Sequence, residues 1–407
     1  MKILLLSAYD ALSHRYWREG LVEQFPDIEW TVLTLPARYF RYRVRSNPLS
    51  WLADYQPTLK AKYDAVIATS MVDVATLRGL VPSLAATPLW LYCHENQFAY
   101  PVGAAKNNPV AHDLEAKMVF IYNCLAADKI SFNSHWNRDS ALAGMAELFR
   151  RFPEKINSSL LDVIANKSDV LPVPLTEKTH AFTSDSALDL DSDVDELPLR
   201  LLWNHRWEYD KGPDRLLALV DALENSGLIC ELNIVGQQFR QLPKAFSLIE
   251  TILEQSSTLQ KGRWGYIDSA SDYQQLLQQC DVVVSTALHD YQGIAILEAV
   301  QAGCVPLLPN QIVYPEIFSN EYLYAVAIPN IATHQDAMIK DAIIKDTATQ
   351  SETNKTIIDE SLTARNMHKQ LERWQQQGLP AVPSITHFKW HKQRNSYQKV
   401  IQSLYKH

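Results

Sequence analysis

The chain has 407 residues, of which 47% are hydrophobic and 21% are charged, and its formal net charge at pH 7 is −8. This length predicts two to three domains, and the composition allows a large core in an ordinary globular protein. The acidic balance argues against a general nucleic-acid binder but allows a local basic patch, and the lack of any run of about 18 apolar residues predicts no transmembrane helix.

The N-terminal run MKILLLSAYD is too short for a signal peptide and has no cleavage-site pattern, so we interpret it as a first β-strand. The five cysteines are widely spaced and form neither a metal-type pair nor a disulfide framework: Cys93, Cys124, Cys230, Cys280 and Cys304. A reducing cytoplasm is the simplest setting for such a chain.

In the first part of the chain, short apolar runs alternate with amphipathic segments such as HRYWREGLVEQF and HDLEAKMVFIYNCLAA. The apolar runs predict buried strands at 2–8, 29–35, 64–70, 88–94, 129–134 and 169–173. Alternating strands and helices predict a parallel sheet with helices on both faces.

An arginine cluster interrupts this pattern at 36–51, PARYFRYRVRSNPLSW. It comprises Arg38, Arg41, Arg43 and Arg45, with Tyr39, Phe40 and Tyr42 between them and Trp51 after them. Guanidinium groups match phosphates and aromatic rings stack on bases, which favours a nucleic-acid acceptor. The alternative is an edge strand and loop whose arginines meet acidic neighbours.

Residues 182–198, FTSDSALDLDSDVDELP, have no stable period and predict a linker. The DSDVD run within it resembles a metal-binding D-x-D motif, but it lies away from any strand end, so we interpret it as a solvated loop. The alternation then restarts, with strands predicted at 200–205, 229–236, 261–267, 281–287 and 304–309 and helices at 213–225, 243–256 and 271–279.

The tail lacks this alternation of strands and helices. Residues 331–378 predict a polar helical region, and PAVPS at 380–384 ends it. Residues 387–407 predict a last amphipathic helix. We therefore predict an N-terminal domain at 1–178, a linker at 179–198, a C-terminal domain at 199–378 and a final helix at 385–407 that packs back across the domains. Two facing sheets of this kind bind ligands beyond the carboxyl ends of their strands.

The segment 285–309, STALHDYQGIAILEAVQAGCVPLLP, carries the strongest functional pattern. A strand ends near Thr286 and a helix begins near Ile294 or Ala295, so its free N–H groups can hold a diphosphate. Gly293 permits close approach to a ligand. Glu298 lies one turn into the helix, where it can accept hydrogen bonds from ribose hydroxyls, and the alternative is a capped helix with acids that favour its dipole.

A second pattern, LLWNHRWEYDKGPDRLL at 201–217, predicts a strand, a loop with Arg206 and Lys211, and a helix opened by Gly212 and Pro213. Two fixed cations can stabilise the negative charge that builds on a leaving diphosphate without a metal. A lone Arg and Lys near a turn are usually solvated, and the neighbouring helix at 293–303 favours the functional interpretation.

Together these segments resemble the E-x7-E signature of retaining glycosyltransferases with the two-domain GT-B fold, with Asp290 in place of the first Glu. The order of SAYDALSHRYWREGLVEQFP, LYCHENQFAYPV, SFNSHWNRDSAL and VYPEIF closely resembles the tRNA-queuosine α-mannosyltransferase family over about 2–320. The resemblance implies an α/β GT-B fold of two Rossmann-like doubly wound domains that face a central cleft. It also implies a cytoplasmic enzyme that transfers mannose from GDP-mannose to queuosine in the anticodon of tRNA-Asp, without a metal, another cofactor or a membrane.

The resemblance also implies roles for individual residues. We expect the catalytic residues to be His94, Arg206, Lys211, Asp290 and Glu298. We expect donor contacts from Ser13, His14, Asn204, Gly236, Tyr266, Ile267, His289, Gly293, Ile294 and Ala295, and acceptor contacts from Arg38, Arg41, Tyr42, Arg43, Arg45, Asn96, Gln97, Tyr100, Asn133 and Ser134.

Four alternatives remain open at this point. The alternative for His94 is a histidine satisfied by a core hydrogen bond, and the alternative for Asn133 and Ser134 is capping of the next helix. The alternative acceptors are a glycan, a lipid or a small metabolite, and the alternative to an enzyme is a catalytically silent tRNA-binding protein on a GT-B scaffold.

Overall fold

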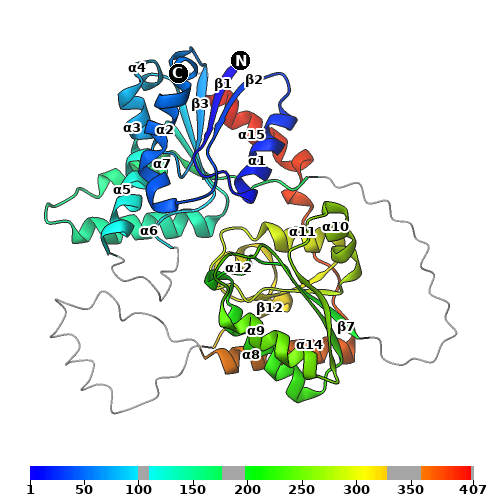
Figure 1. Cartoon of the computed structure of the whole chain (residues 1–407). Helices are drawn as coiled ribbons and strands as arrows, with labels where there is room; N and C mark the ends of the chain where they lie inside the picture. The colour runs from blue at the N-terminus through cyan, green and yellow to red at the C-terminus, as the bar shows by residue number, and fades with distance from the viewer. Residues whose placement is uncertain (100–109, 177–197, 328–358, 405–407) are drawn as a thin grey trace.

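The computed structural model describes residues 1–99, 110–176, 198–327 and 359–404. Two parallel six-stranded sheets lie in two bodies, with helices around each sheet (Figure 1). The strand orders are β2-β1-β3-β4-β5-β6 and β12-β11-β10-β7-β8-β9. Each sheet reverses its winding once, between β1 and β3 in the first and between β7 and β10 in the second, as in doubly wound folds.

The first sheet contains β1 (Lys2–Ser7), β2 (Glu29–Thr34), β3 (Ala65–Thr69), β4 (Leu89–Cys93), β5 (Lys129–Phe132) and β6 (Ser168–Val170). The helices between its strands are α1 (Leu12–Gln24), α2 (Phe40–Lys60), α3 (Val74–Leu80), α4 (Pro82–Ala85), α5 (Val110–Ala126), α6 (His135–Arg151) and α7 (Ser159–Asn166). Strands β1, β3 and β4 are almost wholly buried because helices cover both faces of the sheet, which accounts for their continuous apolar runs.

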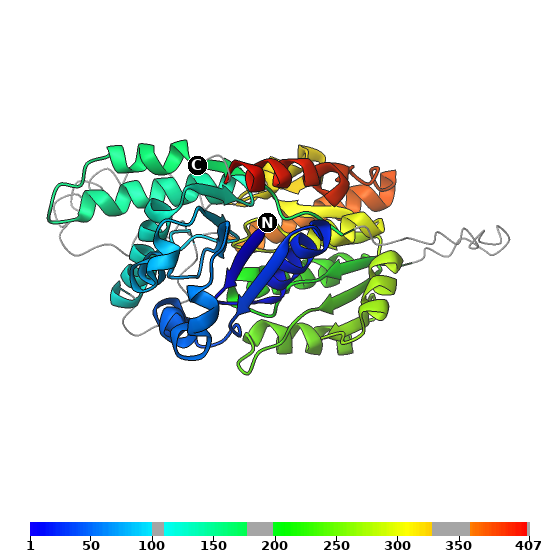
Figure 2. The same ribbon diagram turned by 90° about the horizontal axis from the view of Figure 1, so that it is seen from above.

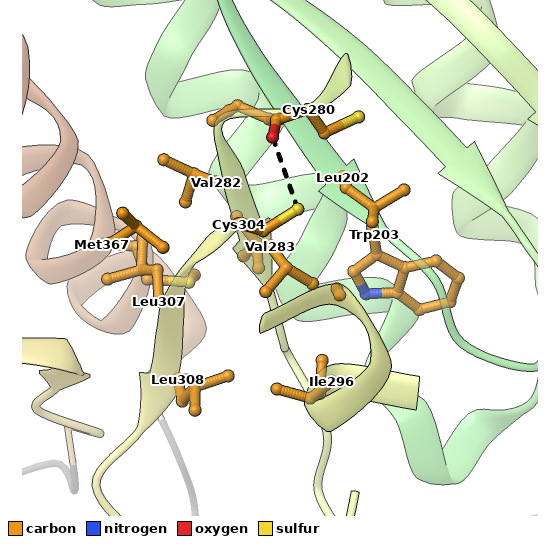
Figure 3. Close-up of a cluster of buried hydrophobic side chains, with 14 of the residues drawn as sticks. Leu202, Trp203, Cys280, Val282, Val283, Ile296, Cys304, Leu307, Leu308 and Met367 are labelled. Carbon is orange, nitrogen blue, oxygen red and sulfur yellow. Dashed lines mark hydrogen bonds between the residues drawn. The ribbon is translucent and has the colours of Figure 1, made fainter. Parts of the chain in front are cut away.

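The second sheet contains β7 (Leu199–Trp203), β8 (Cys230–Val235), β9 (Leu259–Gly265), β10 (Val282–Val284), β11 (Val305–Pro309) and β12 (Leu323–Tyr324). Around it lie α8 (Pro213–Ser226), α9 (Lys244–Gln255), α10 (Ala270–Gln279), α11 (Ile294–Ala302), α12 (Tyr314–Ile317) and α14 (Glu360–Gln377), with 3-10 turns η1 (Tyr209–Lys211) and η2 (Asn320–Tyr322). Figure 3 shows the core beneath α11, where Ile296 packs near Val283 and the Cys304 thiol donates to the Cys280 carbonyl.

The C-terminal helix α15 (Trp390–Ser403), which follows the 3-10 turn η3 (Thr386–Phe388), returns to the first body (Figure 2). The Tyr397 hydroxyl accepts a hydrogen bond from the indole of Trp17 at 2.9 Å and donates to the Pro172 carbonyl at 3.0 Å. Trp390 and Tyr397 belong to the same buried cluster as strand β1. The predicted helix that crosses back is therefore confirmed, and it completes the core of the first body.

All eleven predicted strands are present, although the strand predicted at 281–287 ends at Val284. Strand β12 was not predicted. The alternative interpretation of 36–51 as an edge strand and loop is wrong, because α2 begins at Phe40 and runs through the segment. Residues 179–197 of the predicted linker and 331–358 of the helical region predicted at 331–378 lie outside the described residues. In the rest of that region, α14 confirms the predicted helix. No helix within the described ranges is both long and apolar enough to cross a membrane.

Candidate functional site

A cleft of about 1420 Å³ lies between the two bodies, at the carboxyl ends of both sheets. Its walls are segments that follow the sheet strands, with Tyr9–His14 after β1 and His94–Gln97 after β4 on one side. Segments after β7 and β10 form the opposite side. Parallel sheets expose ligand-binding loops at this position, so the cleft is the candidate active site.

The cleft brings together most of the predicted site residues. All five predicted catalytic residues and all ten predicted donor-binding residues line it, as do Arg41, Tyr42, Asn96, Gln97 and Asn133 from the acceptor set. Arg38, Arg43, Arg45 and Ser134 lie outside its lining. Tyr100 lies outside the described residues.

A buried charge cluster forms the floor on the second body. The Lys211 ammonium donates to the His289 carbonyl at 2.9 Å and lies 3.3 Å from an Asp210 oxygen and 3.5 Å from an Asp290 oxygen. Arg206, which is more exposed, pairs with Asp210 at 3.3 Å and with Glu208 at 2.6 Å. The two cations thus face the cleft from one loop, and the Asp210 carboxylate forms an ion pair with each of them.

Asp290 organises the turn before α11. One of its oxygens accepts the backbone N–H groups of Tyr291 and Gly293 at 3.0 and 3.1 Å, and the other accepts the Tyr314 hydroxyl at 3.2 Å. Gly293 has φ 73°, which favours glycine. Burial alone would raise the pKa of Asp290, but the Lys211 charge and the hydrogen bond from Tyr314 lower it overall, so the carboxylate is charged.

Two histidines beside this cluster are neutral. Burial and the Lys211 charge lower the pKa of His205 to about 3 and that of His289 to about 4. His205 Nε2 lies 3.0 Å from the Ser285 hydroxyl. The positive charge on this wall therefore comes from Lys211 and Arg206 and not from imidazolium groups.

On the first body, His94 sits in an aromatic wall. Its ring stacks on His14 with centroids 4.2 Å apart, and the edges of Trp17 and Tyr92 pack against it at 5.0 and 4.8 Å. Burial, and then the charge of His14, hold the pKa of His94 well below its usual range. Its Nε2 has no hydrogen-bond partner among the described residues, so the structure does not support a histidine satisfied by a core hydrogen bond at that nitrogen.

The asparagines predicted to meet the acceptor have structural contacts instead. The Asn96 amide is fully buried, donates to Asn137 and Ser140, and accepts from the backbone N–H groups of Phe98 and Ala99. Asn133 donates to the His94 carbonyl at 2.9 Å. The hydrogen-bonding capacity of the Asn96 side chain is used inside the protein, so these contacts give no support to its predicted contact with the acceptor.

Ser134 and Arg45 also have partners within the first body. The Ser134 hydroxyl caps α6 by accepting the Asn137 N–H at 3.0 Å, which agrees with the capping alternative. Arg45 lies 2.5 Å from the buried carboxylate of Asp73 and 3.4 Å from Glu115. These ion pairs neutralise much of the Arg45 charge, so Arg45 contributes little positive charge to the cleft.

The N-terminus of α2 presents Tyr39, Phe40, Arg41 and Tyr42 at the cleft rim. Tyr42 is 77% exposed and Tyr39 is 73% exposed, although large aromatic side chains are usually half-buried or more. The Arg38 guanidinium lies 5.8 Å from the centre of the Tyr39 ring. The rim therefore offers exposed aromatic side chains next to positive charge.

Sequence reasoning missed several residues of the site. Glu95 directly follows the predicted His94, and Asp210 directly precedes the predicted Lys211, so their neighbours in the sequence could have indicated both acids. Tyr314 comes from another helix, α12, so it had no such neighbour. Asp210 joins Arg206 to Lys211, and Glu95 lies 2.8 Å from His14. Both carboxylates set the charge and position of a predicted residue.

Comparison with known proteins identifies the family. Residues 2–175 match the family model described as tRNA-queuosine alpha-mannosyltransferase N-terminal, and residues 192–360 match the one described as glycosyl transferases group 1. The chain is 31% identical to the tRNA-queuosine alpha-mannosyltransferase of Drosophila melanogaster over 323 residues, which is 79% of this chain and 83% of that protein.

This chain belongs to the tRNA-queuosine alpha-mannosyltransferase family. It is accordingly a glycosyltransferase. Solved structures agree on the fold: sucrose-phosphate synthase from Thermosynechococcus elongatus superimposes with a TM-score of 0.58 at 14% identity, covering 100% of this chain and 99% of that one. The trehalose-6-phosphate synthase OtsA gives a TM-score of 0.56 at 14% identity, covering 99% of both chains. The GT-B fold is therefore confirmed.

In this member of the tRNA-queuosine alpha-mannosyltransferase family, side chains of the second body bond directly to the first. Glu316 on α12 accepts the backbone N–H groups of His135 and Trp136 at 2.8 and 2.9 Å, at the start of α6. The Tyr291 hydroxyl donates to the Asn96 carbonyl at 2.6 Å. A carboxylate at a helix N-terminus is stabilised by its free N–H groups and dipole, so Glu316 favours the arrangement of the two bodies seen here.

Glu316→Ala is expected to shift the enzyme toward more open arrangements. Loss of a charge at a helix N-terminus typically costs about 0.3–1 kcal/mol, and up to about 2 kcal/mol in good geometry, so kcat/KM should fall about two- to fivefold. Small-angle scattering should show a larger radius of gyration for the variant. Glu321→Ala, at an exposed acid of the same body, is the control, and equal radii for all three proteins would contradict the role of Glu316.

Proposed function

We propose that this chain transfers mannose from GDP-mannose to queuosine in the anticodon of tRNA-Asp, with retention at the anomeric carbon, in the cytoplasm. The observation that carries the proposal is a single cleft with a cation cluster on one wall and an exposed aromatic and arginine rim on the other. The first feature suits a nucleoside diphosphate sugar and the second suits an unpaired RNA loop. Membership of the family supports the choice of sugar and acceptor.

In the proposed reaction, the donor diphosphate lies against Lys211, Arg206 and the N-terminus of α11. These groups stabilise the negative charge that grows on the leaving GDP, so the reaction needs no metal. Glu298, one turn into α11, binds the ribose, and Asp290 and the neutral His94 orient the hexose. The acceptor hydroxyl attacks on the face from which GDP leaves, and a donor phosphate oxygen takes its proton.

The acceptor loop is proposed to bind along the N-terminus of α2. Tyr42 and Tyr39 give stacking faces for splayed bases, and Arg41 lies at the rim to contact a phosphate. Recognition of single-stranded loops through stacking and charge is the usual mode for sequence-specific RNA binding. Binding at this rim would direct the modified base into the cleft beside the donor.

Tyr42→Ala should weaken binding of queuosine tRNA by about 5- to 100-fold, since stacking of one base is worth about 1–3 kcal/mol. Arg41→Ala should weaken binding and reduce the slope of log K against log salt by about 0.7–0.9. Filter binding across a salt series measures both effects. Tyr122→Ala is the control, because Tyr122 is 51% exposed but lies outside the cleft lining, and unchanged affinity in both test variants would exclude this rim.

A transfer assay tests the proposed function directly. The protein is incubated with queuosine-containing tRNA-Asp and GDP-mannose, with UDP-galactose and GDP-glucose in parallel reactions, and the digested nucleosides are weighed by mass spectrometry. A gain of one hexose on queuosine from GDP-mannose alone is expected. Donor hydrolysis without transfer would indicate another acceptor, and bound tRNA with neither reaction would indicate a silent RNA-binding protein.

A further inference from the structure

Glu95 is a carboxylate held at the meeting point of three strand ends in the first body. One of its oxygens lies 2.8 Å from Nε2 of His14, which follows β1, and the other accepts the Ser70 hydroxyl, which follows β3, at 2.6 Å. Glu95 itself follows β4. Its side chain is 23% exposed and lines the cleft, whereas the His14 side chain is only 4% exposed. The Glu95 carboxylate is therefore held by His14 and Ser70 and is accessible from the cleft.

The two internal hydrogen bonds leave capacity for a ligand. A carboxylate accepts about four hydrogen bonds, and each oxygen of Glu95 has one internal partner among the described residues. The other carboxylate on the described part of this wall, Asp10, is bound by Arg18 through both oxygens at 3.2 and 2.9 Å, and its side chain is only 5% exposed. Since the Asn96 amide is also fully used, Glu95 is the more accessible acid on the described part of the first body's wall, and it can accept ligand hydroxyls.

We propose that Glu95 binds both hydroxyls of the acceptor's vicinal diol in the complex before transfer, one on each carboxylate oxygen, and so determines acceptor specificity; this rests on the proposed function. The attacking hydroxyl then turns its proton from Glu95 to the donor phosphate oxygen, as the new glycosidic bond forms and the bond to GDP breaks. Hydrogen bonds from hydroxyls to a carboxylate are charge-assisted and are stronger than those to a neutral amide. A rigid carboxylate also favours two hydroxyls at a fixed spacing. The hexose of the donor is the other diol that can enter this cleft, and the experiment below separates the two.

His14 acts as a positioning residue for Glu95. Its ring is held by stacking on His94, and its imidazole meets the carboxylate. Burial alone would lower the pKa of His14, but Glu95, with a smaller contribution from Asp10, raises it overall. Burial would likewise raise the pKa of Glu95, but His14, then Ser70 and Arg206, lower it. Both groups are thus charged in the resting enzyme, and the diol meets an ionised carboxylate.

The test compares Glu95→Gln with wild type in two assays. Loss of a charge-assisted hydrogen bond costs about 1.5–3 kcal/mol, so kcat/KM for transfer to queuosine tRNA should fall about 10- to 100-fold. The Kd for GDP-mannose without tRNA should change less than about twofold. Glu19→Gln, an exposed acid on α1, is the matched control. An unchanged kcat/KM, or an equal loss in donor affinity, would overturn the proposal, and failure of wild type to modify the tRNA would overturn the proposed function with it.

A second variant tests the charge of Glu95 through the pH dependence of activity, which a purely structural role of His14 would not change. His14→Phe keeps a ring against His94 but removes the charge beside Glu95. The active form of Glu95 is the carboxylate, so activity is lost as pH falls through its pKa, which in wild type lies below the ordinary value of 4.5. The variant should lose activity at a higher pH than wild type. Loss of the His14 charge also raises the pKa of His94, so His14→Phe is compared in the wild-type and in the Glu95→Gln background. A shift of the acid limb that is equally large in the Glu95→Gln background, or no shift in either, would overturn the role of Glu95.

Discussion

Lys211→Met is expected to lower kcat for hexose transfer by about 100- to 1000-fold, the range seen when a fixed stabiliser of developing charge is removed. Lys211 is 9% exposed, and its ammonium is held by the His289 carbonyl, Asp210 and Asp290. It therefore needs little reorganisation when charge appears on a diphosphate beside it. Methionine keeps much of the side-chain volume but cannot supply the charge.

The same substitution leaves the Asp210 and Asp290 carboxylates without their shared cation. Like charges in a buried site repel, so some loss of stability is also expected. Circular dichroism and the thermal midpoint separate this loss from the kinetic effect, since kcat is measured on the fraction that is folded. Lys261→Met, at a less buried lysine on β9, is the control. A kcat within threefold of wild type in a folded Lys211→Met protein would exclude the charge-stabilising role.

The arrangement of strands was predictable because parallel, doubly covered strands leave a simple pattern of buried apolar runs. The same rule located the cleft residues. Arg206, Asp290 and His94 each follow such a run, and the carboxyl ends of parallel strands meet at one edge of the sheet. Positions near strand ends were therefore predicted without any knowledge of side-chain contacts.

The α2 segment shows where pattern reading failed. Val44, Pro48 and Trp51 are buried at helical spacing, with Asn47 beside them, and this period was present in the sequence. The arginines and aromatics between them concealed it, and Pro48 inside the segment argued against a helix. Packing of this apolar face outweighed the local preference, and the helix then placed Arg41 and Arg45 in different surroundings.

Side-chain partners were the least predictable feature. The amide of Asn96 follows a strand and resembles a ligand-binding group, but its partners Asn137 and Ser140 lie more than forty residues away in the chain. The pairing of His14 with Glu95 spans 81 residues. Such contacts depend on how helices pack against the sheet, which a local pattern does not specify.

Gly212→Ala is expected to disrupt both the fold and the reaction. Gly212 has φ 65° and separates Lys211 from the start of α8. A Cβ placed there would lie 2.0 Å from the Thr286 carbonyl oxygen, so backbone must move. The change should destabilise the fold by about 2–5 kcal/mol, which combines the left-handed backbone cost with overpacking. A shift of about 1 Å in the Arg206–Lys211 loop should also reduce transfer about 100-fold.

Gly227→Ala provides a matched control at the other end of the same helix. Gly227 has φ 75°, and a Cβ there meets no heavy atom within 4 Å. It should therefore show only the backbone cost of about 1–2 kcal/mol and leave transfer unchanged. Urea unfolding and transfer kinetics of both variants isolate the contact with Thr286. Equal losses of stability and full activity in both variants would contradict this prediction. They would mean that the contact of Gly212 with Thr286, just after β10, does not hold the Arg206–Lys211 loop in place.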